Sequence, residues 1–482
     1  MTPIPDLATP HLPSTRVLIS GRWCEGRAQI EVLQKYDGST LAWVHEAGRD
    51  QVAHAVQVAD EASRRGMLAP VDRARVLRRT AEIIGRDAQR FIAVMVDEAG
   101  FTVSDAQGEV DRSIVTLMLC AEEATRLTGE TVSFGASSGQ HHRIGFTLRV
   151  PLGVVCAITP FNSPLNTVIH KIGPALAAGN AVVLKPSVLA PLSSALLCEA
   201  LLEAGLPPEL IMLVHGDEPV GQALLEEPAI AFYAFTGSTR VGRLIQAGAG
   251  LRRTQLELGS IASVIVCADA DLERAAPKIA NASFRKAGQV CTSVQRLYVQ
   301  RSVVEPLTEL VARAAQAMPA GDPREPQTRV GPLVSARAAQ RVHAWVHEAC
   351  AAGALAVTGG TRQRNVLAPT VLAGVRRDMK VVDQEIFGPV LSILPFDTLD
   401  EAIAGANDSP YGLASGIFTR DIDTAFRAVR RLRFGAVHIN ETSSSRADAM
   451  PFGGVKDSGF GHEGPGHAIR EMTEQRLVTY TP

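Results

Sequence analysis

The chain has 482 residues, of which 46% are apolar and 20% are charged. At about 150 residues a domain, this length gives room for roughly three domains with substantial cores. The formal net charge of -2 provides no field that attracts nucleic acid or acidic membranes, and no apolar run approaches the ~18 residues of a membrane span. We therefore expect a cytoplasmic protein with no nucleic-acid or membrane partner.

The N-terminal third predicts two helices and a hairpin. Apolar residues recur at helical spacing over 72–98, with arginines between them, which indicates one long amphipathic helix. A second helix is expected over 108–127. Residues 129–143 contain glycines, serines and paired histidines, a composition typical of a hairpin whose exposed edge invites pairing with another subunit.

From residue 150 onward, short apolar runs alternate with segments of helix length. The runs are continuous and rich in β-branched residues, as in strands that are buried on both faces. They lie at 154–158, 181–184, 211–214 and 230–235, and the predicted helices between and after them at 164–178, 191–204 and 239–249. This alternation predicts a doubly wound parallel sheet with a ligand crevice at the carboxyl ends of its strands.

The same alternation recurs between residues 256 and 446, which predicts a second α/β domain. Its expected strands are 264–267, 297–299, 390–394, 416–418 and 436–439. A glycine-rich stretch at 451–466 then leads into a strand-like tail at 476–480.

The cysteines and histidines give no sign of a disulfide framework or a metal site. The seven cysteines are odd in number, widely spaced and without a CxxC pair, so most are expected to be small buried hydrophobes. His141 and His142 are adjacent rather than four residues apart on a helix, with no acidic or thiol ligand at metal spacing. Residues 135–139 fit the GxSxG pattern, but the predicted hairpin lacks the strand and helix that flank a nucleophilic serine.

Two segments of the first α/β unit are suited to a nucleotide. Only seven of the 48 basic residues are lysines, and Lys185 stands at the end of an apolar strand. There it could donate to a ribose hydroxyl, the alternative being a surface lysine with a buried stem. Residues 235–242 (FTGSTRVG) follow a strand and open a helix, so backbone amides and Ser238 could bind a pyrophosphate, although the segment is not GxGxxG.

Three further residues supply the parts of covalent acyl chemistry. Cys291 follows a Gly-Gln pair at a predicted helix start, where the helix dipole would favour a thiolate. Glu257 ends a short strand, and Asn162 lies in a loop between two prolines. Each also has an ordinary interpretation as a buried cysteine, a surface glutamate or a turn asparagine. Together they are a nucleophile, a base and an oxyanion donor.

Taken together, the motifs resemble the aldehyde dehydrogenase superfamily over essentially the whole chain. They stand in order as TPFN (159–162), GPALAAGN (173–180), VVLKP (182–186), FTGST (235–239), LELG (256–259), FxxxGQxC (284–291) and EIFGP (385–389). The resemblance implies an α/β fold with a Rossmann-like coenzyme domain (1–125 and 146–255), a catalytic domain (256–446) and a return to the coenzyme domain (447–470). A small β element (126–145 and 471–482) would join copies into a homodimer or homotetramer.

The resemblance also implies the chemistry. In that family the residue matching Cys291 attacks an aldehyde, and the oxyanion is held by the amide matching Asn162 and by the cysteine's own N–H. After hydride leaves to a nicotinamide, the glutamate matching Glu257 activates water to hydrolyse the thioester. Lys171 matches a lysine near this centre. A free acid is then the expected product, the alternatives being a CoA-acylating enzyme, which generally lacks that glutamate, and a thiol esterase.

The coenzyme is expected to be NAD or NADP, with NAD favoured slightly. The family's contacts fall on Thr159, Pro160, Phe161, Lys185, Ser187, Val188, Gly221, Phe235, Thr236, Gly237, Ser238, Val241, Leu258, Gly259, Glu385 and Phe387. Many NAD-preferring members carry a glutamate where this chain has Val188, so use of both coenzymes is open. Ser260 and Ile261 replace the usual Gly-Lys or Gly-Asn after LELG, which leaves the backbone path beneath the nicotinamide open.

The substrate tunnel is expected near Ser163, His170, Arg112, Val290, Thr292 and Arg446. If the two arginines converge with His170, they would bind an anionic group on a short aldehyde. The alternative is that they form ion pairs, with Glu109, Asp111 and Asp448 as local partners. Aromatic, short hydroxylated and anion-bearing aldehydes all remain open as substrates.

Overall fold

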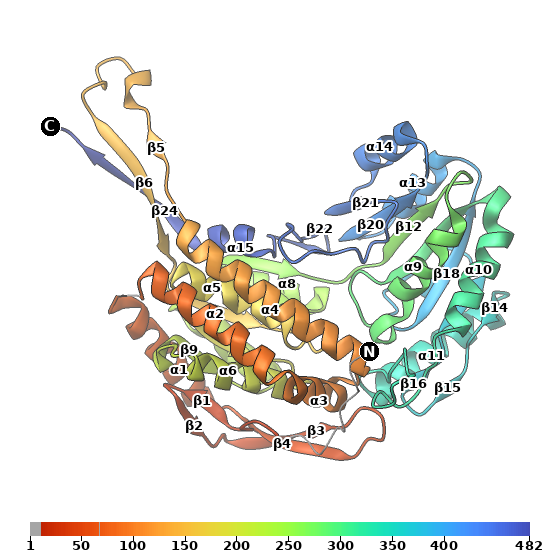
Figure 1. The fold of residues 1–482 in the computed structure, drawn as a ribbon, viewed down its shortest axis with the longest axis horizontal. Coiled ribbons are helices and arrows are strands. Elements are labelled where there is room, and N and C mark those ends of the chain that lie inside the picture. The colour runs from red at the N-terminus through yellow and green to blue at the C-terminus, as the bar shows by residue number, and fades with distance from the viewer. Residues whose placement is uncertain (1–10, 67) are drawn as a thin grey trace.

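The computed structural model describes residues 11–66 and 68–482, which form two α/β units and a projecting β arm (Figure 1). Among the described helices, none combines the length and apolarity that crossing a membrane requires. Nor do the described residues contain a cluster of three or more His, Cys, Asp or Glu side chains that could hold a metal ion.

The first unit is built on an eight-stranded sheet. Its strand order is β2-β1-β9-β8-β7-β10-β11-β23. The strands are β1 (Val17–Ile19), β2 (Arg22–Cys24), β7 (Val154–Ile158), β8 (Ala181–Lys185), β9 (Ile211–Leu213), β10 (Ile230–Thr236), β11 (Arg253–Glu257) and β23 (Gly459–Phe460). The five central strands are parallel, as predicted, and antiparallel strands close both edges.

The direction of winding reverses between β7 and β10. The chain runs outward through β8 and β9 on one side of β7, and then returns to place β10 and β11 on the other. The carboxyl ends of β7 and β10 therefore flank a topological switch point, where ligands bind in folds of this kind.

Helices cover both faces of this sheet (Figure 1). They are α1 (Arg49–Arg64), α2 (Pro70–Arg86), α3 (Ala88–Ala99), α4 (Val103–Arg126), α5 (Asn166–Ala178), α6 (Leu192–Glu203), α7 (Glu218–Glu226), α8 (Thr239–Ala249) and α15 (Pro465–Glu471). The single helix predicted over 72–98 is wrong, because the chain breaks at Asp87 between α2 and α3. Arg86 holds the break by pairing with both Asp87 and Glu203.

The second unit is built on a seven-stranded sheet in the order β14-β17-β18-β13-β12-β20-β21. Its strands are β12 (Ala262–Val266), β13 (Val294–Gln300), β14 (Leu355–Thr358), β17 (Thr370–Ala373), β18 (Val390–Phe396), β20 (Ala414–Phe418) and β21 (Ala436–Ile439). Its helices are α9 (Leu272–Phe284), α10 (Val304–Gln316), α11 (Ala336–Ala351), α12 (Lys380–Asp383), α13 (Leu399–Asn407) and α14 (Ile422–Arg431). All strands but β14 run parallel, as the apolar runs predicted.

Three short antiparallel pairs complete the strands of the two units. They are β3 (Ala28–Leu33) with β4 (Thr40–Glu46), β15 (Arg362–Gln363) with β16 (Val366–Leu367), and β19 (Tyr411–Gly412) with β22 (Val455–Lys456).

The arm projects from the first unit as a three-stranded sheet, β24-β6-β5 (Figure 1). Its strands are β5 (Thr131–Val132), β6 (Ile144–Pro151) and β24 (Thr473–Tyr480). The hairpin predicted over 129–143 ends too early, because the long strand β6 starts only at Ile144. Residues 135–139, which fit GxSxG, lie in the connection between β5 and β6, with no strand-to-helix turn around them.

Candidate active site

The nucleophile candidate Cys291 lies in a turn between a 3-10 turn at Arg285–Gly288 and strand β13. Lys286, Ala287 and Gly288 have φ values of 51°, 54° and 67°, so three residues in succession are left-handed. A Cβ on Gly288 would lie 2.2 Å from the carbonyl oxygen of Gly388. The helix start predicted at Cys291 is therefore wrong: the close approach of two backbones forces a turn, and no helix dipole acts on the thiol.

Asn162 reaches this turn from the other unit. It lies in the loop after β7, and its Nδ2 donates to the carbonyl oxygen of Gln289 at 2.7 Å. Gln289 is fixed in turn, since its Oε1 accepts from the backbone N–H of Val334 at 2.9 Å. The fold thus places the amide of Asn162 beside the turn that carries Cys291, although the two residues are far apart in the chain.

Glu257 is a buried carboxyl without a hydrogen-bond partner. It ends β11, is 2% exposed, and neither of its oxygens has a partner among the described residues. Burial raises the pKa of Glu257 well above its ordinary value, and the nearby carboxylate of Glu463 raises it further. An unsatisfied buried carboxyl with a raised pKa is a candidate proton acceptor.

A buried ion network surrounds Glu257. The carboxylate of Glu463 pairs with Lys171 Nζ at 2.9 Å and with Arg446 Nη2 at 2.6 Å. Lys171 Nζ also donates to Gln255 Oε1 at 3.0 Å. Burial raises the pKa of Glu463, but these two cations outweigh burial and hold it well below its ordinary value. Sequence analysis missed Glu463, although an acidic residue inside the glycine-rich 451–466 stretch was a signal.

The thiol of Cys291 lies within the field of these charges. Burial raises its pKa to about 12, against the opposing effect of Arg446, and the carboxyl groups of Glu257, Glu463 and Glu385 add to the rise. This raised pKa favours the thiol form of Cys291 over the predicted thiolate, so as a candidate nucleophile it would need to lose a proton in order to react.

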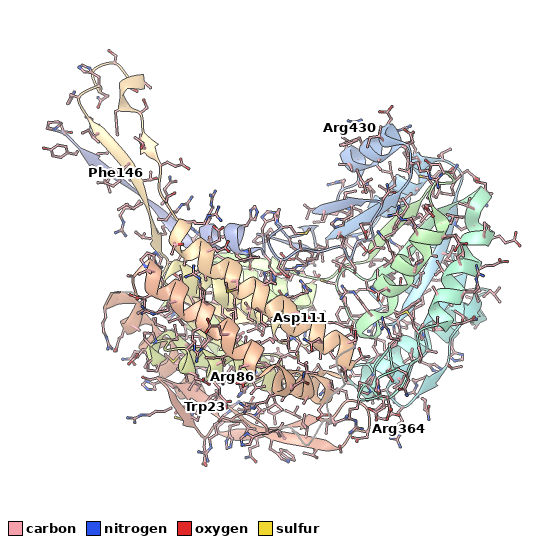
Figure 2. The ribbon with its side chains drawn as sticks, viewed as in Figure 1. Trp23, Arg86, Asp111, Phe146, Arg364 and Arg430 are labelled. Atoms are coloured by element: carbon pink, nitrogen blue, oxygen red, sulfur yellow. The ribbon has the colours of Figure 1, made fainter. Side chains whose placement is uncertain are left out.

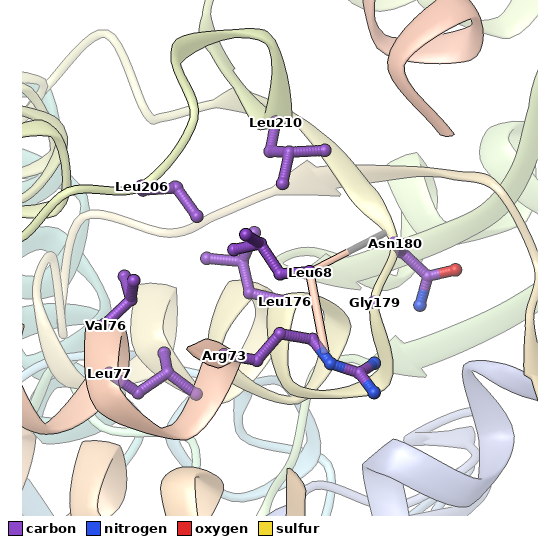
Figure 3. Close-up of a pocket in the computed structure, with 9 residues that line it drawn as sticks. All are labelled: Leu68, Arg73, Val76, Leu77, Leu176, Gly179, Asn180, Leu206 and Leu210. Carbon is purple, nitrogen blue, oxygen red and sulfur yellow. The ribbon is translucent and has the colours of Figure 1, made fainter. Parts of the chain in front are cut away.

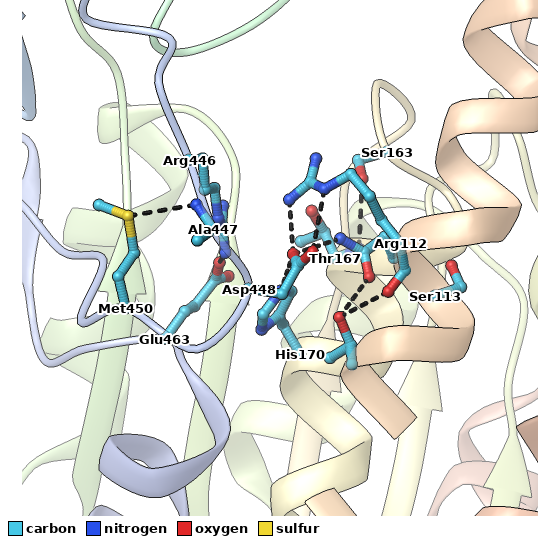
Figure 4. A network of polar contacts seen from close by, with 12 residues as sticks. Arg112, Ser113, Ser163, Thr167, His170, Arg446, Ala447, Asp448, Met450 and Glu463 are labelled. Carbon is cyan, nitrogen blue, oxygen red and sulfur yellow. Dashed lines mark hydrogen bonds and ion pairs between the residues drawn. The ribbon is translucent and has the colours of Figure 1, made fainter. Parts of the chain in front are cut away.

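Arg112 and His170 converge on a single acidic residue, Asp448 (Figure 4). Arg112 approaches Asp448 with two nitrogens, at 2.6 and 3.2 Å, and His170 Nε2 lies 3.0 Å from its Oδ1. The pKa of Asp448 is raised by burial but lowered much more by His170 and Arg112, so it stays ionised. Arg446 turns instead toward Glu463, so the two arginines and His170 do not converge at one point as predicted.

The other predicted tunnel residues lie around the nucleophile turn. Ser163 donates to Glu109 Oε1 at 2.5 Å. The carbonyl oxygen of Thr292 accepts from both Ser443 and Ser444. Val290, which precedes the cysteine, is half-buried.

A further cation near the nucleophile was missed by sequence analysis. Arg285 is partly buried and forms no ion pair with any described residue. Burial lowers its pKa and Arg112 lowers it further, while Asp105 and Glu109 act in the opposite direction. Its position six residues before Cys291 was the only signal.

The predicted coenzyme residues gather at the switch point. Thr159, Pro160 and Phe161 follow β7. Lys185 ends β8, with Ser187 and Val188 half-exposed just after it. Gly221 lies opposite, where a Cβ would come within 4.0 Å of Lys185 Cε. Phe235 and Thr236 end β10.

Beyond β10, Gly237 leads to Ser238, which caps α8 by accepting from Val241 N at 3.4 Å. This N-terminus at the switch point has the features that bind a pyrophosphate. The residues of this crevice therefore fit a dinucleotide.

Glu385 marks the end of this crevice nearest Cys291. Its Oε1 accepts from the backbone N–H of Ser260 at 2.9 Å, and its Oε2 lies 3.0 Å from where a Cβ on Gly259 would be. Burial raises the pKa of Glu385 to about 7. Phe387 packs edge-on against Phe161 with ring centres 5.9 Å apart, and Leu258 precedes Gly259.

An apolar hollow elsewhere holds none of these residues. It lies between α2, α5 and the connection from α6 to β9, and Arg73 and Asn180 are its polar lining residues (Figure 3). It is therefore separate from the candidate active site.

Comparisons with known proteins show which family the chain belongs to. Residues 23–478 match the family model described as "Aldehyde dehydrogenase family". The chain is 43% identical over 461 residues to the 3-sulfolactaldehyde dehydrogenase of Priestia aryabhattai, covering 95% of this chain and 96% of that protein. Aldehyde dehydrogenase 21 from Physcomitrella patens, solved with its product succinate, superposes with a TM-score of 0.94 at 32% identity, over 97% of this chain and 98% of that one. An indole-3-acetaldehyde dehydrogenase solved with NAD+ gives 0.93 at 33% identity, over 97% and 96%.

Proposed function

The chain belongs to the aldehyde dehydrogenase family, and on that basis we propose that it oxidises a short, anion-bearing aldehyde to the free carboxylic acid with a nicotinamide coenzyme. The observation that carries this proposal is the buried, unpartnered carboxyl of Glu257 in the same charge network as the Cys291 thiol. A base at that place favours attack by water over thiolysis by CoA.

The first step is addition of the Cys291 sulfur to the aldehyde carbon. The C–S bond forms as the thiol proton passes to water, and the electron pair of the C=O π bond moves onto the aldehyde oxygen. The oxygen that becomes negative is held by Asn162 Nδ2 and the backbone N–H of Cys291. Asn162 then exchanges its present bond to Gln289 for one to the substrate.

The residues at the switch point would hold the coenzyme, with Ser238 binding the pyrophosphate, Lys185 the adenosine ribose and Glu385 the nicotinamide ribose. When bound, the nicotinamide supplies the hydride acceptor that allows the thiohemiacetal to become a thioester. Glu257 then takes a proton from the water that attacks the thioester, and the C–S bond breaks as the acid leaves. The guanidinium of Arg446 stabilises the sulfur anion that is released.

For the coenzyme, we propose that NAD and NADP are both accepted, with NAD favoured slightly. Val188 is half-exposed just beyond Lys185, so the described surface at this point presents an apolar side chain rather than a carboxylate. A carboxylate there would repel the 2′-phosphate of NADP.

For the substrate, we propose an anionic group bound between Arg285 and Arg112. Arg285 forms no ion pair with a described residue, and Arg112 is held in place by Asp448 while its side chain stays 35% exposed. A 43% identical relative is named for a sulfonated aldehyde, and one solved neighbour was determined with succinate. Both of those names denote anionic molecules.

For the assembly, we propose that the arm joins copies into a homodimer or homotetramer. Ile144, Phe146 and Leu148 alternate along β6 and are 59%, 42% and 45% exposed. Phe146 is visible on the arm in Figure 2. Tyr480 lies opposite Ile144 on β24 and is 61% exposed, so one apolar face of the arm has no cover within the described chain.

We expect Glu257→Gln to retain acylation and lose hydrolysis. Rapid mixing with an aldehyde and NAD+ should give a burst of about one NADH per site, followed by turnover about 10²- to 10⁴-fold below wild type, since a positioned base contributes that much. In wild type, hydrolysis should slow as the pH falls through the raised pKa of Glu257, because the protonated carboxyl accepts no proton. The control substitution is Glu309→Gln, at an exposed residue of helix α10. Normal turnover in Glu257→Gln would remove it from this role.

We expect Val188→Glu to disfavour NADP. The new carboxylate should lower kcat/KM for NADP relative to kcat/KM for NAD. The expected change corresponds to roughly 1–3 kcal/mol, the scale of an unpaired buried polar contact. Val188→Gln, which has the same shape without the charge, should change the ratio much less. Equal kcat/KM ratios in wild type and Val188→Glu would place Val188 away from the 2′ position.

We expect wild type to prefer an acid-bearing semialdehyde over the neutral aldehyde of equal length by roughly 10- to 100-fold in kcat/KM, since a charged hydrogen bond is worth about 1.5–3 kcal/mol. Arg285→Gln and Arg112→Gln should each reduce this ratio, whereas the exposed control Arg313→Gln should not. A preference for benzaldehyde that neither substitution alters would support an aromatic substrate instead.

We expect Phe146→Asp with Leu148→Asp to dissociate the assembly, because each substitution would bury a charge in an apolar contact. Light scattering should give twice or four times the chain mass for wild type and a smaller assembly for the variant. Ile422→Asp, at an apolar residue on α14 that is 60% exposed, is the control. A wild-type monomer would contradict the proposed assembly.

A further inference from the structure

Glu109 connects three elements from inside the protein. It lies on α4, and its side chain is 1% exposed. Its Oε1 accepts from the hydroxyl of Ser163 at 2.5 Å and from the backbone N–H of Asn166 at 2.9 Å, both just after Asn162. Its Oε2 pairs with Lys286 Nζ at 2.7 Å. One oxygen of the carboxylate thus binds the segment that follows Asn162, and the other binds Lys286 in the turn before Cys291.

Lys286 makes the connection from the other side. Its side chain is 7% exposed and lies over the ring of Phe101 at 4.2 Å. Its Nζ also donates to the backbone carbonyl of Asn162 at 3.2 Å. Its φ of 51° is rare for a residue with a side chain, so the surrounding contacts must hold the backbone there.

Asn162 is therefore fixed to the nucleophile turn at both ends. Its backbone oxygen binds Lys286 and its side-chain amide binds Gln289, five and two residues before Cys291. Neither Glu109 nor Lys286 has a role in the proposed bond-making steps. Both are nearly excluded from water, where a charged pair is strong but tolerates little change in geometry.

We propose that Glu109 and Lys286 are positioning residues that set the distance between the amide of Asn162 and the sulfur of Cys291. This inference rests on the proposed function, because the two groups need alignment only if Asn162 holds an oxyanion formed on Cys291. The pair also joins the two α/β units at this point, since α4 and the Asn162 loop belong to the first and Lys286 to the second.

The informative variant removes both charges at once. Lys286→Met alone would leave a buried carboxylate without its cation, and misfolding would then hide any effect on alignment. Glu109→Gln with Lys286→Met keeps the volume of both side chains and leaves no buried charge. Its matched control is Glu348→Gln with Lys380→Met, which removes an ion pair of the same 2.7 Å length on the surface of the second unit.

The first measurement tests whether Asn162 depends on the pair. In the wild-type background, Asn162→Ala should lower kcat/KM by about 10²- to 10³-fold, the usual loss for an oxyanion donor. In the Glu109→Gln/Lys286→Met background, the same substitution should cost less than about 10-fold, because the amide is already misaligned. The dissociation constant for NAD+, measured by fluorescence titration, should stay within about twofold, which a general loss of structure would not allow.

The second measurement needs no activity. Hydrogen–deuterium exchange of peptides covering 159–166 and 284–292 should speed up together in the double variant and stay unchanged in the control pair, while α10 keeps its wild-type rate.

A full loss on Asn162→Ala in both backgrounds, or unchanged exchange in both loops, would overturn the positioning role. A wild type with no Cys291-dependent aldehyde oxidation would instead overturn the proposed function, and the exchange data would still decide whether the pair holds the two loops together.

Discussion

A single buried carboxylate, Glu463, sets the electrostatics of the region around Cys291. It is balanced by Lys171 and Arg446, and its own charge raises the pKa of the neighbouring Glu257. Removing the charge of Glu463 would leave two buried cations without their anion, a change that costs several kcal/mol in protein interiors. The same arrangement places the cation of Arg446, which lowers the pKa of Cys291, among carboxyl groups that raise it.

This network is supplied by parts of the chain that meet only in the folded protein. Lys171 comes from α5, Glu257 from the end of β11, and Glu463 from the glycine-rich segment that returns to the first unit. The antiparallel pairing of β23 with β11 brings that segment back, with Gly459 opposite Glu257. The short edge strand therefore has an electrostatic consequence, because it brings the carboxylate of Glu463 close to Glu257.

Pairing of buried charges also explains why the arginines behave differently from one another. Arg112 and Arg446 each have a carboxylate partner, and Glu109, which is close to Arg112 in the sequence, is already bound to Lys286. Arg285 has no such partner among the described residues, which leaves its charge for a ligand. The preference proposed for an anionic substrate thus depends on which cations the buried carboxylates pair with: Asp448 with Arg112, Glu109 with Lys286, and Glu463 with Arg446.

The sequence by itself determined the two parallel sheets, because strands that are buried on both faces must be continuously apolar and this pattern is local. It also singled out Cys291, Glu257 and Asn162 as candidate site residues, because their motifs are short. The break at Asp87, the left-handed turn before Cys291 and the partners of the arginines were decided only by the tertiary structure. Each depends on contacts between distant segments: Arg112 and Asp448 are 336 residues apart, and no local pattern records which carboxylate a buried cation will meet.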